Sequence, residues 1–60
     1  MMAFLLLHRS SGVITLEAGD SAAYAHDHGF TITPAVVDGD ACVMLLRNDD
    51  WVATAQPVVL

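Results

Sequence analysis

The chain has 60 residues and a mass of 6.4 kDa, which allows one domain at most, spanning residues 1–60. Its single cysteine, Cys42, excludes an intrachain disulfide. The formal net charge is −5 with two cations, Arg9 and Arg47, which argues against direct binding to a nucleic-acid backbone.

The amino-terminal segment, residues 1–7, is apolar but lacks the pattern of a targeting segment. No basic region precedes it, and His8 and Arg9 interrupt it well before the about 20 apolar residues that a membrane span needs. We therefore expect no membrane span and no secretory signal, and a location in the cytoplasm or within an assembled particle such as a virion. Residues 4–9 are predicted to form a strand that is packed on both faces, because they are apolar on both.

The next two elements are a half-exposed strand and a short helix. Residues 13–17 alternate, with Ile14 and Leu16 on one face, which is typical of a strand with one side in solvent. Near residues 20–29 we predict one short helix or an ordered loop. Asp20 can cap the helix amino terminus, and Gly29 can take the left-handed conformation that ends it.

A hairpin follows. Residues 30–37 are predicted to form a strand, and Pro34 places it at a sheet edge or at a bulge because proline cannot donate a hydrogen bond. Asp38-Gly39 fits a tight turn with positive φ at both central residues. Residues 41–47 then return as a central strand, in which Cys42 is interpreted as a buried small hydrophobe rather than a reactive nucleophile.

The last third contains a turn at 48–50 and two further apolar segments. Residues 51–55 are predicted to form a strand with Trp51, Ala53 and Ala55 on one face, and residues 58–60 a terminal strand or an arm. Together the elements predict a mainly β domain, a small antiparallel barrel or sandwich of about five strands, with apolar terminal arms at 1–7 and 57–60.

Clusters of polar residues were considered as sites of chemistry. His26 and His28 could share a metal ion only in an extended segment, and a helix end separates the two rings. The acidic turns at 38–40 and 48–50 do not have the spacing of a calcium loop. We therefore predict no metal site and no cofactor. Because the serines have no nucleophile-elbow context, we also predict no catalytic residue and no small-molecule substrate.

These patterns favour a non-enzymatic structural assembly subunit that packs apolar surface and termini against other protein chains in a homo- or hetero-oligomer. Apolar residues make up 55% of the chain, and a domain of this size has few positions in which to bury them. A capsid-stabilising protein of a virion would fit this description. The predicted contact residues are Phe4, Leu5, Leu6, Trp51, Val58, Val59 and Leu60.

Two alternative functions and the role of Trp51 stay open. The chain could be a small acidic inhibitor or regulator that blocks a partner's basic or nucleic-acid-binding surface, which requires its carboxylates to gather on one face. It could also, more weakly, be a metal-binding module that uses His26 and His28. Trp51 could be either a core residue or an interface anchor.

Overall fold

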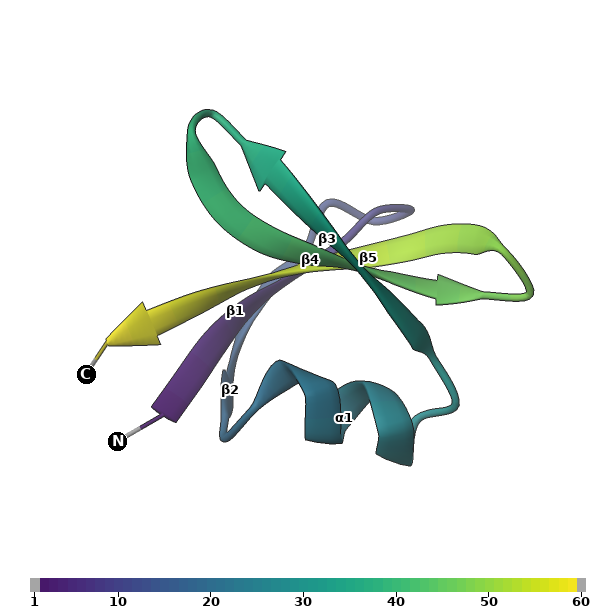
Figure 1. The fold of residues 1–60 in the computed structure, drawn as a ribbon, viewed down its shortest axis with the longest axis horizontal. Coiled ribbons are helices and arrows are strands. Elements are labelled where there is room, and N and C mark those ends of the chain that lie inside the picture. The colour runs from purple at the N-terminus through teal and green to yellow at the C-terminus, as the bar shows by residue number, and fades with distance from the viewer. Residues whose placement is uncertain (1, 60) are drawn as a thin grey trace.

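The computed structural model describes residues 2–59 and confirms the mainly β architecture, with five antiparallel strands in one sheet and one short helix. The strand order across the sheet is β2-β1-β5-β4-β3, so the first and last strands are neighbours near its middle. Figure 1 shows the helix lying across one side of the sheet and the two chain ends lying together. The elements are β1 (Met2–His8), β2 (Ile14–Ala18), α1 (Ser21–Asp27), β3 (Thr31–Val37), β4 (Asp40–Arg47) and β5 (Asp50–Val59).

Two tight turns connect the last three strands. Asp38 and Gly39 take φ values of 52° and 83°, which confirms the predicted turn between β3 and β4. The turn between β4 and β5 is built in the same way by Asn48 and Asp49, with φ values of 51° and 65°. Asparagine and aspartate tolerate this left-handed region better than other residues with a side chain, so both hairpins close with two residues.

The predicted helix cap is present. The Asp20 carboxylate accepts a hydrogen bond from the backbone N–H of Ala22 at 3.2 Å. Gly29, with φ of 75°, turns the chain away after the helix, as expected of a left-handed glycine at this position. The helix is short enough to need tertiary contacts, since fewer than about twelve residues are marginal in isolation.

A row of stacked rings supplies those contacts. The Tyr24 ring meets the edge of the Phe4 ring from β1 at 5.5 Å between centroids and stacks on His28 at 4.0 Å. Phe30 lies beyond His28, and the Arg47 guanidinium covers its outer face at 4.4 Å. This row ties α1 to both β1 and β4.

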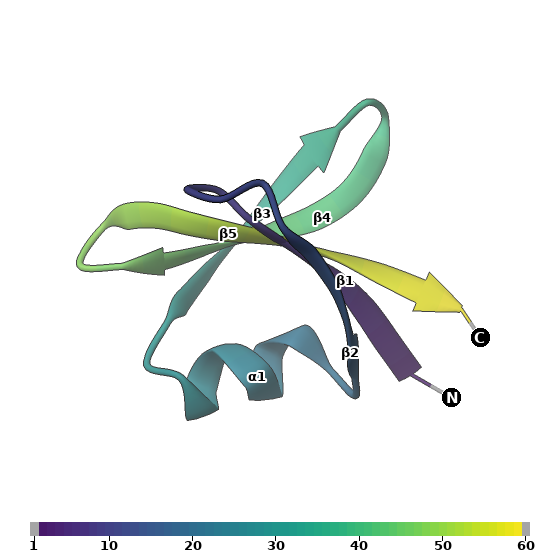
Figure 2. The same cartoon turned by 180° about the vertical axis from the view of Figure 1, so that it is seen from behind.

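The core lies between α1 and the sheet face that the helix covers. Phe4, Leu6 and Leu45 are its largest fully buried side chains, and their neighbours are Ala25, Ala53 and Ala55. The short alanine side chains let the helix and strands approach closely, and the large residues fill the remaining space. Figure 2 shows the same arrangement from behind, with α1 beneath the sheet and the β3–β4 hairpin rising on the other side.

The structure corrects two details of the expected strands. Pairing shifts at Leu45 and Leu46, which lie opposite Ala53 and Trp51 respectively, so one residue of β5 is extra. This β-bulge turns Trp51 away from the face that carries Ala53, and the prediction that the two share a face is wrong. Residues 51–55 and 58–60 were expected as separate segments, but β5 runs continuously through Pro57. Proline fits there because pairing with β4 ends at Ala55 and only β1 continues alongside.

The sheet is neither closed into a barrel nor covered by a second sheet. Its edge strands β2 and β3 are not neighbours, and within residues 2–59 only α1 forms a second layer. Of the expected terminal arms, residues 2–7 belong to β1 and residues 57–59 to β5, and the two strands pair with each other from Met2–Val59 to His8–Ala53; residues 1 and 60 lie outside the described residues. Strand β1 is therefore packed on one face only, and Leu5 and Leu7 remain partly exposed on the other. No helix in the described chain is long and apolar enough to cross a membrane.

Candidate functional site

The sheet face opposite α1, here named the open face, carries a row of large apolar side chains. Strand alternation places Leu5 and Leu7 of β1 on this face because Phe4 and Leu6 are in the core. Ile14 lies opposite Leu7 and Leu16 lies opposite Leu5, so β2 extends the row. Six large apolar residues of the open face are exposed, with these exposed fractions: Leu5 (38%), Leu7 (41%), Ile14 (61%), Leu16 (58%), Val37 (52%) and Trp51 (38%).

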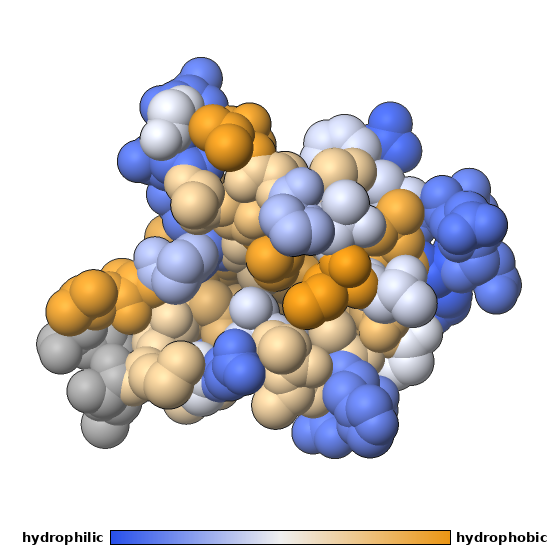
Figure 3. All heavy atoms as spheres, in the orientation of Figure 1, coloured by the Kyte–Doolittle hydropathy of each residue, from blue (hydrophilic) through white to orange (hydrophobic). Residues whose placement is uncertain are grey.

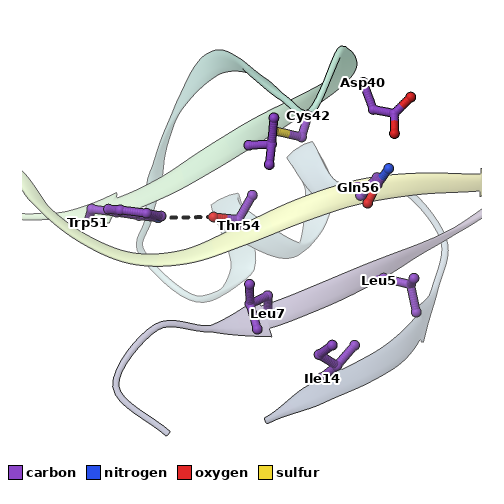
Figure 4. Close-up of a pocket in the computed structure, with 9 residues that line it drawn as sticks. Leu5, Leu7, Ile14, Asp40, Cys42, Trp51, Thr54 and Gln56 are labelled. Atoms are coloured by element: carbon purple, nitrogen blue, oxygen red, sulfur yellow. Dashed lines mark hydrogen bonds between the residues drawn. The ribbon is translucent and has the colours of Figure 1, made fainter. Parts of the chain in front are cut away.

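A groove of about 240 Å³ runs along the open face. Figure 4 shows Trp51 at one end of it and Asp40 near the other, with Leu5, Leu7 and Ile14 along one side. Thr54 and Gln56 of β5 lie between these ends, and Val37 and Cys42 complete the lining. Among the described residues that line the groove, Asp40 is the one that carries a charge.

Trp51 is held in a defined orientation at its end of the groove. Its indole N–H donates to the carbonyl of Ala53 at 3.0 Å and to the Thr54 hydroxyl at 3.1 Å. The Arg9 guanidinium lies 4.6 Å from the centroid of the ring, which adds a cation–π contact. Since the polar atom of the ring already has partners, the exposed remainder of Trp51 is an apolar surface.

Charge is distributed unevenly along the groove. Arg9 stands at the Trp51 end, near the β4–β5 turn that carries Asp49 and Asp50, whereas the Arg47 side chain lies on the helix side of the sheet, over the Phe30 ring. Asp38 and Asp40 form the other end, at the β3–β4 turn. Asp40 and Leu46, the partner of Trp51, are six residues apart on β4, which separates the two ends by about 20 Å.

The predicted contact residues are placed as follows. Leu5 and Trp51 lie on the open face, whereas Phe4 and Leu6 are buried under α1 in the core of this chain. Val58 is partly buried and Val59 is exposed at the end of β5. Leu60 lies outside the described residues.

Sequence reasoning did not single out four other exposed apolar residues of the open face, namely Leu7, Ile14, Leu16 and Val37. The alternation of Ile14 and Leu16 could have identified this face, because their apolar side chains had to lie either in the core or on an exposed apolar surface.

The polar clusters considered from sequence are dispersed. His26 points into solvent at the helix end, whereas the His28 ring stacks on Tyr24 and its Nδ1 lies 2.8 Å from the Tyr24 carbonyl oxygen. No group of three histidine, cysteine, aspartate or glutamate side chains within residues 2–59 is placed to hold one metal ion. Cys42 is buried, in agreement with its interpretation as a small hydrophobe.

Comparison of the chain with protein-family models, with curated proteins and with solved structures found no match.

Proposed function

We propose that this protein is a non-enzymatic assembly subunit whose open face is covered by another protein chain. The observation that carries the proposal is the row of six large apolar side chains around the groove. Their exposed fractions together equal nearly three fully exposed side chains, or on the order of 500 Å², which is at the upper end of the largest apolar patch on a typical monomer. Patches of this size on soluble proteins commonly mark sites of association.

The lining of the groove supports protein contact over catalysis. Its polar members are Asp40, Thr54 and Gln56, and the residues that line it include no histidine that could serve as a base. Cys42, the one thiol among these lining residues, is buried. Trp51 stands at one end with its N–H satisfied, which is the arrangement of an aromatic anchor at a protein interface.

The placement of the carboxylates favours this proposal over an acidic inhibitor. Asp38 and Asp40 belong to one turn and Asp49 and Asp50 to another, and β4 separates the two turns. Asp20 is engaged as the helix cap. Figure 3 shows hydrophilic residues (blue) in separate groups at the top left, right and bottom of the molecule, with apolar residues (orange) between them and at the left. A partner's basic groove would be matched better by carboxylates gathered in one patch.

Site-specific photo-crosslinking in the cell that naturally makes the protein tests the proposal. A photoreactive amino acid replaces Leu16 in one variant and Glu17 in the control, which is the next residue on β2 and faces the opposite side. We expect covalent adducts with protein from position 16 and few or none from position 17. Absence of adducts from position 16, or equal yields from both positions, would refute the proposal.

A further inference from the structure

We propose that the chain covering the open face is a second copy of this protein, packed face to face about a two-fold axis through the groove. This inference rests on the proposed function and names its partner. Each copy would place its sheet against the other sheet and its α1 on the outside, which gives four layers in the order helix, sheet, sheet, helix. The projecting β3–β4 hairpin of each copy would reach the Trp51 end of the other.

The exposed area of the open face is large enough to be covered by a second copy of the chain. The accessible surface of the chain is 4192 Å², whereas a compact monomer of 6.4 kDa is expected to expose about 3,800 Å². The apolar row supplies on the order of 500 Å², and further exposed or half-exposed residues of the same face, such as Thr33, Met44 and Gln56, add to it. The sum approaches the about 800 Å² per partner that a stable interface buries.

The charge pattern of the face is complementary to itself. At the Trp51 end, the cation of the open face is Arg9, which lies on the Trp51 ring beside the groove, whereas Arg47 lies on the helix side, over the Phe30 ring. At the other end lie the carboxylates of Asp38 and Asp40. Residues 38–42 of this hairpin include no cationic side chain. A two-fold axis between the ends would bring Arg9 of each copy to Asp40 of the other. A partner of a single charge sign would match one end and be repelled at the other.

Trp51 is suited to be the anchor of such a contact. Its two hydrogen bonds are internal to β5, so burying the ring against a second copy strips no polar atom of water. Arg9 and the hydrogen bonds fix the ring before contact, and a preordered side chain loses little entropy on binding. The symmetric arrangement would use this anchor twice.

Sedimentation equilibrium of the purified full chain over a range of micromolar concentrations tests the inference, with folding followed by far-UV circular dichroism. We expect the unmodified chain to have twice the chain mass. Leu16→Asp, which places a carboxylate on the open face of both copies, should weaken association by about 100-fold or more. The matched control is Val36→Asp, an equally charged change at a residue that is 72% exposed on the other side of β3 and should leave association unchanged.

A charge exchange tests the two-fold geometry separately. Arg9→Asp alone, or Asp40→Arg alone, should weaken association by roughly ten-fold, because each places like charges together at two symmetric contacts. The double variant Arg9→Asp/Asp40→Arg restores opposite charges and should associate more tightly than either single variant. A double variant no tighter than the singles would overturn the proposed arrangement.

The remaining outcomes separate this inference from the function on which it rests. A purified chain that stays monomeric, or a Val36→Asp variant that dissociates as fully as Leu16→Asp, overturns the second copy as partner. If the photoreactive group at position 16 then captures a protein of another mass in the cell, the assembly function stands and the partner is a different chain. If it captures none, both proposals fall.

Discussion

Leu45 is the residue at which the core is expected to be most sensitive to truncation. The side chain is fully buried, and its neighbours Ala53 and Ala55 are too short to fill the space that Leu45→Ala would leave. Loss of three carbon atoms costs about 2.4 kcal/mol of transfer free energy, and the unfilled cavity raises the total to about 3–4 kcal/mol. A chain of 60 residues has a free energy of unfolding of only about 3–9 kcal/mol, so the change removes much of it.

The matched control is Leu46→Ala, the adjacent residue on the same strand. Leu46 is half-buried and faces the open side, so its truncation should cost about 1 kcal/mol. Urea unfolding followed by the fluorescence of Trp51 and by circular dichroism measures both variants. With a slope of about 1 kcal/mol per molar urea for so short a chain, Leu45→Ala should lower the midpoint by about 3 M.

All variants are compared at one chain concentration, because the proposed association of the folded chain would add to its apparent stability. If the midpoint of Leu45→Ala falls no further than that of Leu46→Ala, the assignment of the core to the helix-covered face is wrong.

Two further predictions concern local backbone structure and are measured by the same urea titration. Asp20→Ala removes the acceptor for the Ala22 N–H and should lower the free energy of unfolding by about 1 kcal/mol. The control Asp27→Ala, at the exposed helix end, should change it by less than about 0.5 kcal/mol, and equal losses in the two variants would contradict the role of Asp20 as helix cap. Asp49→Gly removes the steric strain of a side chain at φ of 65° and should raise the free energy of unfolding by up to about 1 kcal/mol, while Asp49→Val should lower it. A loss of stability in the glycine variant would refute this account of the turn.

Much of the fold could be predicted from the sequence because short-range chemistry determines it. Asp38-Gly39 has few alternatives to a two-residue turn between apolar strands, and Asp20 with Gly29 marks both ends of a helix. Pro34 limited its strand to a sheet edge or a bulge, and β3 is an edge strand. Each of these features depends on residues within a few positions of one another.

The features that escaped prediction depend on pairing between distant strands. The bulge opposite Leu45 and Leu46 leaves no mark in the sequence of β5, and it alone moves Trp51 from the core face to the open face. Strand β1 is covered on one face because the second layer of the described structure is a helix and not a second sheet. Apolar residues on both faces of β1 indicated packing on both sides, but the sequence could not tell which face the helix covers.

The adjacency of β1 and β5 also bears on how the protein is made. These strands pair from Met2–Val59 onward, so their contact closes a loop spanning nearly the whole chain. During synthesis the apolar strand β1 leaves the ribosome early and has β2 as its one available neighbour until β5 emerges. Topologies with such distant contacts fold slowly, so the apolar strand β1 stays exposed to solvent for longer during synthesis. Binding of a chaperone to the nascent chain would protect this strand from aggregation.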